Sequence, residues 1–153
     1  MPPATSRHRN LPQLMLQSRE ALMARFRPLL KRHGVTEQQW RIVRALQELG
    51  PLEPRQIVDR CAISSPSLAG VLSRMDALGL VTRTRLDHDQ RRLQVALTAK
   101  SRALARRLAP QIEAVYDDIE QRIGRRFTQD FYATLDELVA RLDEPGDEAS
   151  PAA

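Results

Sequence analysis

The sequence predicts a mainly α-helical fold with one small β-hairpin. Apolar residues recur at helical spacing along most of the 153 residues, and 6 glycines are too few for a doubly wound nucleotide-binding fold. One stretch alternates instead, with Leu93, Val95 and Leu97 on one face, as in a half-buried strand. The length fits one domain, and 42% hydrophobic residues are enough to form its core.

The N-terminal part predicts an arm followed by a helix. Residues 1–10 are polar, so we expect a flexible arm there. The helix expected over residues 11–33 is capped by Asn10, kinked by Pro28 and ended by Gly34.

A capping box opens the second helix. The run Thr36-Glu37-Gln38-Gln39 has the residue types that exchange hydrogen bonds at a helix start, and Gly50-Pro51 ends the helix. The apolar face that we expect for it consists of Trp40, Val43, Leu46 and Leu49.

Two short helices with a tight turn between them come next. The first begins at Pro54, and the second is capped by Ser64 and closed by Gly79. The second offers a small, polar face, which favours a helix-turn-helix whose second helix enters the DNA major groove; the alternative is an ordinary helical hairpin. The face is formed by Ser65, Ser67, Ala69, Gly70, Ser73 and Arg74, and the inward residues of the first helix are Ile57, Val58 and Cys61.

A basic hairpin follows directly. We expect strands over Leu80–Arg85 and Arg92–Leu97 with a polar loop over residues 86–91. A basic hairpin after such a helix is typical of a wing, whose tip arginine enters the narrow minor groove. The fold class predicted is therefore a winged helix-turn-helix with a small β wing and with N- and C-terminal dimerisation helices.

The C-terminal part predicts two more helices. Thr98 caps a helix over about 99–123 that Pro110 interrupts, and Thr128 caps a last helix. Residues 143–153 are acidic and are expected to be disordered. We therefore expect a single domain over 11–142, with a DNA-binding lobe over 36–97. The helices over 11–33 and 98–142 carry apolar stripes that a second subunit would cover, although packing within one chain is the alternative.

Charge and motifs separate the function classes. Residues 54–107 carry 11 Lys/Arg against 4 Asp/Glu, whereas residues 108–153 carry 4 against 11. The basic middle of the chain favours a nucleic-acid partner. No phosphate loop, metal-ligand spacing or nucleophile–base pair is present, so we expect no enzyme, no cofactor and no metal site. The single cysteine and the absence of an apolar leader or membrane segment indicate a cytoplasmic protein without membrane contact.

Several segments together resemble the MarR family of bacterial transcription regulators over about residues 11–142. They are Thr36–Arg41, Ser67–Gly79 followed by Leu80-Val81, Asp89–Arg92 and Leu97-Thr98, and Ser101 departs from the family, which usually has glycine there. Within the family the chain looks most like the regulators of homoprotocatechuate operons, on Gln17–Ala21, Phe26-Arg27-Pro28 and Cys61-Ala62-Ile63.

This resemblance implies a homodimeric repressor on a palindromic operator of double-stranded DNA. It also implies control of an aromatic-compound catabolic operon and release by a small aromatic carboxylate of the hydroxyphenylacetate, hydroxybenzoate or hydroxynicotinate class. A ligand-blind DNA-binding protein and a redox-responsive regulator using Cys61 are the alternatives.

The DNA-contacting residues are expected on the second short helix, the helix before it and the wing. Arg91 is the candidate for the wing tip, with Asp89 placed to hold it by a charge-assisted hydrogen bond. The full set is Gln56, Ser64, Ser65, Ser67, Gly70, Arg74, Arg83, Arg85, Asp89, Arg91 and Arg92.

The effector is expected where the dimerisation helices meet the DNA-binding lobe, the usual place in this family. The ring of Trp40 offers a stacking surface, Arg19 and Arg41 each offer a partner for a carboxylate, and Ser18 offers a hydrogen bond. The alternative places Trp40 in the core and both arginines at the surface or in a subunit ion pair.

Overall fold

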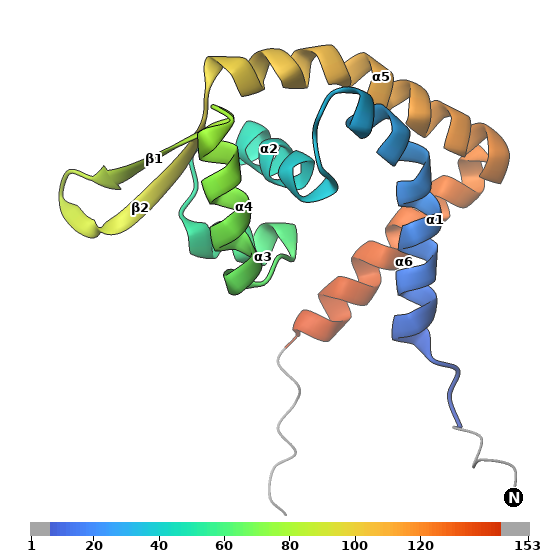
Figure 1. Cartoon of the computed structure of the whole chain (residues 1–153). Helices are drawn as coiled ribbons and strands as arrows, with labels where there is room; N and C mark the ends of the chain where they lie inside the picture. Colours follow the sequence, from blue (N-terminus) through green and yellow to red (C-terminus); the bar gives the residue numbers. More distant parts are fainter. Residues whose placement is uncertain (1–6, 145–153) are drawn as a thin grey trace, which may run out of the picture. The chain divides into compact units, whose positions relative to one another are not determined.

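The computed structural model describes residues 7–144 (Figure 1). Over this range the chain forms six helices and one two-stranded antiparallel sheet, which confirms the mainly α-helical prediction. Within the same range, no helix has the length and apolar character that a membrane span requires. In chain order the elements are α1 (Leu11–Arg32), α2 (Glu37–Leu49), α3 (Pro54–Cys61), α4 (Ser65–Ala77), β1 (Val81–Leu86), β2 (Asp89–Leu97), α5 (Ala99–Ile123) and α6 (Arg125–Asp143).

The chain divides into two compact units, Met1–Glu113 and Ala114–Ala153, and the boundary falls inside α5. The described part of the first unit contains α1 to α4, the hairpin and the first part of α5. The described part of the second unit contains the rest of α5 and all of α6. The lobe predicted over residues 36–97 therefore lies wholly within the first unit.

The core of the first unit joins α2, α3, α4 and the hairpin. Ile42, Ile57 and Met75, one from each of these helices, are fully buried, and so is Val95 on β2. Leu52 extends this packing to the backbone, because its N–H and carbonyl bond to those of Val95 at 3.0 and 2.7 Å. The hairpin is thus tied at its root to the segment between α2 and α3.

Side chains close the starts of α1, α2 and α5. The Asn10 side chain accepts the Gln13 N–H at 3.0 Å, as predicted for α1. The capping box at α2 is formed by reciprocal bonds of 3.1 Å between Thr36 and Gln39. Ser101, where glycine is usual in the family, is fully buried, and it exchanges bonds of 2.9 and 3.2 Å with Thr98. The departure at this position therefore supplies a capping box at the start of α5.

The end of α4 is closed by a left-handed glycine and by α5. Gly79 has φ +70°, and the next residue donates its N–H to the Met75 carbonyl at 2.8 Å. Lys100 Nζ donates to the Leu78 carbonyl at 2.7 Å, and the Thr98 hydroxyl donates to the Gly79 carbonyl at 2.6 Å. The start of α5 is therefore fixed against the C-terminal end of α4, while α3 lies toward the opposite end (Figure 1).

The hairpin is longer than predicted. The polar loop expected over residues 86–91 is wrong, because the turn consists of Asp87 and His88 alone and β2 begins at Asp89. Arg85 pairs with Leu93 but Leu86 pairs with Asp89, so residues 90–92 form a bulge. The strands persist because Asp89 and Arg85 satisfy backbone groups inside that bulge.

Two expectations for α5 and α6 are corrected. The interruption expected at Pro110 is absent: α5 runs through it, and buried Leu108 and Ile112 hold the turns on either side. The cap expected at Thr128 is also wrong, because Gly124 precedes the first residue of α6, and the Thr128 hydroxyl donates to the Gly124 carbonyl at 2.9 Å within the helix.

Parts of the predicted arm and tail lie outside the residues that the structure describes. The last helix includes Asp143, so the acidic tail begins later than residue 143. Residues 1–6 of the expected arm and 145–153 of the expected tail lie outside the described residues.

Three apolar residues differ from their predicted burial. Leu49 is exposed because it ends α2 beyond the packed turns, and Val58 is half-buried. Trp40 is also half-buried, and the buried residues of α2 are Gln39, Ile42, Val43 and Leu46.

Candidate nucleic-acid interface

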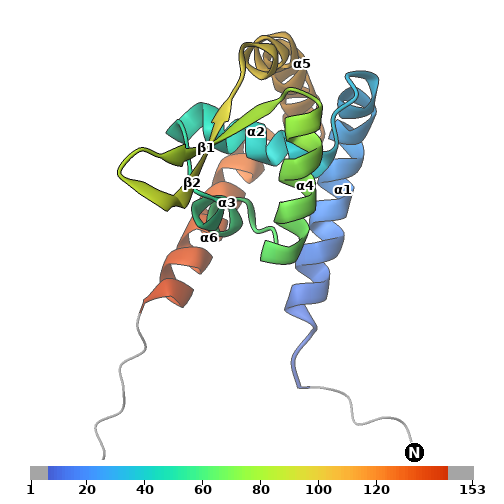
Figure 2. The same cartoon turned by 60° about the vertical axis from the view of Figure 1, so that its left-hand side comes forward.

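The face of α4 turned away from the core is small and polar. Ser65, Ser67, Ala69 and Ser73 are exposed along it, while Leu68, Val71, Leu72 and Met75 are buried on the other side. Small side chains let another molecule approach the backbone closely, as major-groove insertion requires. Figures 1 and 2 show the hairpin extending from the helical body beside α3 and α4.

The first turn of α4 is left uncapped by its own side chains. Ser64 occupies the N-cap position, but its hydroxyl donates to Ser67 Oγ at 2.9 Å instead of accepting a backbone N–H. Free N–H groups and the positive end of the helix dipole favour an anion at this position. The geometry therefore suits a DNA phosphate at the start of α4.

Arg74 lies against Gly70 on the same face. A Cβ added at Gly70 would lie 3.4 Å from Nη1 of Arg74, so the guanidinium covers this glycine. Within the described chain the Arg74 side chain has no hydrogen bond or ion pair. It is therefore free to turn toward a phosphate, and such a movement would uncover the Gly70 backbone.

A groove of about 530 Å³ lies between α3, α4 and the hairpin. Ser65 and Arg83, both predicted site residues, line it together with Arg55 of α3. The Arg55 guanidinium has no partner among the described residues. Sequence reasoning did not select Arg55. Its position one residue before Gln56, at an exposed site of a helix-turn-helix, was the available signal.

Part of the Gln56 side chain is used to cap the N-terminus of α3, the helix that contains it. Its side-chain oxygen accepts the Glu53 N–H at 2.9 Å in the capping box of α3. The amide NH₂ of Gln56 is the part of this side chain that remains for a contact with phosphate.

Arg91 lies exposed in the bulge of the wing. Its side chain has no partner within the described residues, and its backbone N–H donates to Asp89 Oδ1 at 3.0 Å. The charge-assisted bond expected between Asp89 and the Arg91 guanidinium is therefore not formed, and Asp89 instead fixes the backbone that carries Arg91. Arg85 supports the same bulge, because Nη1 donates to the Gln90 carbonyl at 2.9 Å.

The other two wing arginines are held by carboxylates of the helical body. Arg83 pairs with Asp76 of α4 at 2.9 Å, and Arg92 pairs with Glu53 just before α3. The hydrogen bond that Arg92 donates to Glu53, followed by the negative charge of Glu53, raises the pKa of Arg92 above its usual value. An exposed ion pair contributes about 0.2–1 kcal/mol, so a phosphate can draw Arg83 away from Asp76 at small cost.

The candidate effector residues lie on two helices, but their polar groups are engaged elsewhere. On α1, the Ser18 hydroxyl donates to the Leu14 carbonyl at 2.8 Å, and Arg19 pairs with Glu37 at the start of α2. On α2, Arg41 Nη1 donates to the Cys61 carbonyl at 2.6 Å. Arg41 Nε is buried without a hydrogen-bond partner. Of the four candidate effector residues, Trp40 alone has no polar contact within the described chain that an effector would have to replace, and its ring is half-buried.

Cys61 is packed at the end of α3. Its side chain is 4% exposed, and its thiol lies 3.6 Å from the Arg41 carbonyl oxygen. Burial raises the pKa of the Cys61 thiol, and the nearby Arg41 charge lowers it by a smaller amount. The thiol is therefore less ionised near neutral pH than an exposed one.

Comparison with known proteins decides the family. A model of the MarR family matches residues 33–92. The homoprotocatechuate degradative operon repressor of Escherichia coli is 42% identical over 145 residues, which cover 92% of this chain and 98% of that repressor. The chain belongs to the MarR family. Its relatives are transcription regulators and not enzymes.

Two solved structures of MarR regulators resemble nearly the whole chain. The transcriptional regulator PA4135 is 37% identical with a TM-score of 0.85, over 90% of this chain and 100% of that one. NadR in complex with 4-hydroxyphenylacetate is 38% identical with a TM-score of 0.76, over 89% of this chain and 96% of that one. These likenesses confirm the winged helix-turn-helix fold class.

The interface of this MarR regulator contains acidic residues that sequence reasoning passed over. Glu53 and Asp76 are placed by the fold beside Arg92 and Arg83, from positions 39 and 7 residues away. The pairing of Glu53 with Arg92 depends on the β-bridge between Leu52 and Val95, and no local sequence pattern predicts this bridge. Glu37 is likewise found beside Arg19 only once α1 and α2 are packed.

Proposed function

We propose that this MarR regulator is a homodimeric repressor that binds a palindromic operator and leaves it when a small aromatic acid binds. The observation that carries the DNA-binding part is the unpaired basic set Arg55, Arg74 and Arg91. These arginines come from α3, α4 and the wing, the three elements that surround the groove. In this proposal α4 lies in the major groove and the wing tip in the minor groove.

The arrangement of charge supports contact with DNA on this side of the first unit. Arg55 and Arg74 have no carboxylate partner in the described chain, so binding to phosphate breaks no existing ion pair. Arg83 and Arg92 already have partners, so they contribute to a phosphate contact only after releasing Asp76 and Glu53. We therefore assign the larger share of DNA affinity to the three unpaired arginines.

Unpartnered apolar side chains support dimerisation. In α1, Leu11, Met15 and Leu16 are exposed. In α6, Phe127 and Phe131 stack with ring centroids 6.0 Å apart, and both are exposed. Further exposed apolar side chains on α6 are Tyr132, Val139 and Leu142. Exposed apolar stripes of this length are typical of subunit interfaces, and a dimer would match a two-fold symmetric operator.

The effector part of the proposal rests on Trp40 and on the relatives. The E. coli relative represses a homoprotocatechuate degradative operon, and NadR has been crystallised with 4-hydroxyphenylacetate. An aromatic acid stacking on Trp40 would need one guanidinium for its carboxylate. Arg19 is the better placed of the two candidates, because exchanging Glu37 for a ligand carboxylate replaces one carboxylate partner by another, whereas half-buried Arg41 is hydrogen-bonded to the backbone of Cys61.

The test measures operator binding with and without effector. Fluorescence anisotropy of a labelled DNA fragment from upstream of the protein's own gene gives the affinity. Titrations with 4-hydroxyphenylacetate, 4-hydroxybenzoate and 6-hydroxynicotinate then ask which compound releases the protein. We expect release by one of them at micromolar concentrations, at which a control such as cyclohexylacetate, without an aromatic ring, has no effect.

Two outcomes would contradict the proposal in different ways. Tight, sequence-specific binding that survives every compound would favour the ligand-blind alternative. Release by peroxide, abolished in Cys61→Ser, would favour the redox alternative, against which the burial and raised pKa of Cys61 argue.

A further inference from the structure

Two carboxylates of the helical body hold two arginines of the wing. Just before α3, Glu53 accepts hydrogen bonds from Arg92, at 2.7 Å from Nε and also from Nη2. On α4, Asp76 accepts the Nε–H of Arg83 at 2.9 Å. Arg83 lines the groove between α3, α4 and the hairpin, so this pair lies on the surface proposed to contact DNA.

The helices beside these two acids do not account for them. Glu53 occupies the N-cap of α3, where a negative charge suits the helix dipole, but the shorter side chains of Ser, Thr, Asp and Asn are the preferred caps. Asp76 lies in the last turn of α4, where the helix dipole favours a cation and disfavours an anion. The ion pairs with Arg92 and Arg83 therefore explain the two acids better than helix stability does.

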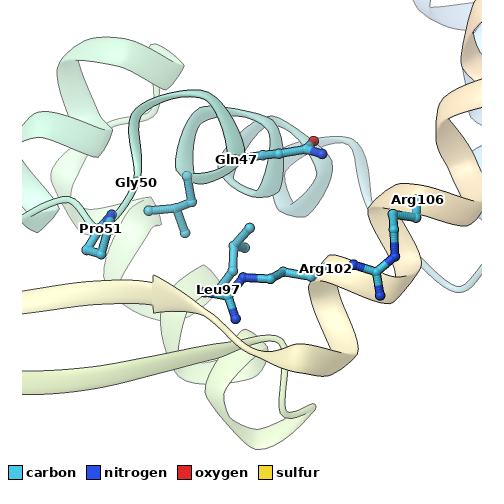
Figure 3. A pocket seen from close by; sticks show the side chains of 7 residues that line it. Gln47, Gly50, Pro51, Leu97, Arg102 and Arg106 are labelled. Carbon is cyan, nitrogen blue, oxygen red and sulfur yellow. The ribbon is translucent and has the colours of Figure 1, made fainter.

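The root of the wing is fixed by contacts other than these ion pairs. Leu52 exchanges backbone hydrogen bonds with Val95, and the hydroxyl of Thr98, directly after β2, donates to the backbone at the end of α4. Pro51, in the loop before Leu52, lines the same pocket as Leu97, the last residue of β2 (Figure 3). A change of partner at either arginine therefore requires no movement of the root of the wing.

Both ion pairs are open to solvent. The side chains of Arg92 and Glu53 are 50% and 29% exposed, and those of Arg83 and Asp76 are 33% and 44% exposed. Because solvent weakens such pairs, each guanidinium can exchange one oxyanion for another. Phosphate and carboxylate groups both accept forked hydrogen bonds from arginine. While a carboxylate holds the arginine, it occupies the donors that a phosphate needs, and its negative charge repels that phosphate.

We propose that Glu53 and Asp76 limit the affinity of this regulator for DNA, because they compete with phosphate for Arg92 and Arg83. This inference rests on the proposed function as a DNA-binding repressor. Its consequence is an operator affinity that an effector can reverse, since one ligand changes the affinity for another by a limited factor, typically about 5–150-fold.

Anisotropy titrations of the operator fragment with the full-length protein test the competition. The double variant Glu53→Gln/Asp76→Asn should bind DNA at least about tenfold more tightly than the parent protein, because both arginines are then free for phosphate. The slope of log K against log salt should become steeper by about 0.9 for each phosphate that is newly neutralised. Glu48→Gln, which removes the acid of an exposed ion pair on α2, is the control and should leave affinity and slope near those of the parent.

Further variants separate competition from a structural role of the acids. Glu53→Thr restores a preferred helix cap and should raise the affinity as Glu53→Gln does. Adding Arg92→Ala to Glu53→Gln should remove the gain, because the gain requires the free guanidinium.

Three results would overturn the competition. Unchanged affinity in Glu53→Gln/Asp76→Asn would show that the acids do not limit binding, and reduced affinity would show that they position the wing for DNA. A gain of equal size in Glu48→Gln, or one that survives Arg92→Ala in full, would show a general effect of charge. Failure of the parent protein to bind the fragment would instead contradict the proposed function, and this inference with it.

Discussion

Arg41 and Cys61 show how one pair of residues fixes the relation between α2 and α3. The guanidinium donates to the Cys61 carbonyl at 2.6 Å, and the cysteine thiol lies 3.6 Å from the carbonyl of Arg41. Arg41 Nε remains buried without a partner, a situation that costs about 1–3 kcal/mol for a polar group. The contact through Nη1 offsets part of this cost. Arg41 therefore acts in joining the two helices, and its use as an effector ligand would disturb that junction.

The burial of Cys61 predicts low thiol reactivity. Its pKa is raised by burial, so near neutral pH the thiolate that reacts with alkylating agents is scarce, and its fraction grows only as pH rises toward that pKa. We expect iodoacetamide to modify the folded protein at least about tenfold more slowly than the urea-unfolded protein at about pH 7.5. Mass spectrometry over time measures both rates. Equal rates would show that Cys61 is accessible and ionised, as the redox alternative requires.

Trp40 is the residue on which the effector assignment depends most. Replacing it by alanine removes the stacking surface while leaving the groove between α3, α4 and the wing intact. In Trp40→Ala, the effector concentration for half-maximal release from DNA should rise by at least about tenfold, with operator affinity little changed.

Trp40→Phe keeps an aromatic ring and provides the control. It should retain most of the effector response, and circular dichroism should show that both variants are folded. An unchanged response in Trp40→Ala would remove this residue from the effector site.

Two kinds of contact fix the wing, and neither of them involves the side chain of Arg91. Asp89 and Arg85 bond to the backbone of the bulge, and Glu53 and Asp76 pair with Arg92 and Arg83. Arg91 has neither kind of constraint on its side chain. The bulge thus presents an unpaired cation on a fixed backbone, which suits insertion into a groove of negative potential.

A comparison of two neighbouring arginines tests this view of the wing. Arg91→Ala should weaken operator binding by about tenfold or more and should lower the salt dependence of binding. Arg92→Ala should have a clearly smaller effect, since Glu53 already neutralises Arg92. Anisotropy titrations at several salt concentrations measure both. An effect of Arg92→Ala equal to or larger than that of Arg91→Ala would contradict the assignment.

Helices with local start and stop signals were predictable from sequence, and features made by tertiary packing were not. The capping box at Thr36, the cap at Asn10 and the glycine at residue 79 all act within a few residues, and the structure contains each of them. The bulge at residues 90–92 was missed because its polar groups are satisfied by the partner strand and by Asp89. A proline at residue 110 locally favours the end of a helix. The helix continues because Leu108 and Ile112, on either side of Pro110, are buried.

The candidate site also has features that the local sequence predicts and features that only the fold creates. Chemical type together with the helix face or the wing pattern was enough to make Ser65, Arg74 and Arg91 candidates. The availability of each arginine depends on carboxylates that the fold brings near, so Arg92 and Arg91 could not be ranked from their order in the chain.

Along the whole chain, a basic middle segment is followed by an acidic C-terminal part. Residues 54–107 have an excess of seven positive charges, and residues 108–153 an excess of seven negative charges. The acidic segment includes α6, whose aromatic residues are exposed. α6 itself carries 3 arginines and 4 carboxylates, so it has no excess of positive charge to attract DNA, and its exposed apolar side chains suit a second subunit.

Substitution on α6 tests the dimer. Burying a phenylalanine contributes about 1.5–3 kcal/mol, so Phe127→Glu/Phe131→Glu should raise the dimer dissociation constant by about tenfold or more. Operator affinity should fall with it, because one subunit reads only half of a palindrome. Arg126→Glu, an exposed position on the same helix, controls for added charge. Sedimentation velocity measures the association. A dimer that is unaffected by the double change would place the interface elsewhere.

The most direct test of the DNA-binding surface is the salt dependence of operator binding in a triple variant, Arg55→Gln/Arg74→Gln/Arg91→Gln. These three arginines come from α3, α4 and the wing, and each is unpaired within the described chain, so we expect a large decrease in affinity. The slope of log K against log salt should fall by about 0.9 for each phosphate that a subunit no longer neutralises. The matched triple variant Arg102→Gln/Arg106→Gln/Arg107→Gln removes the same charge from α5 and should keep a slope near that of the parent protein. Equal slopes in the two triple variants would contradict the assignment of this surface to DNA.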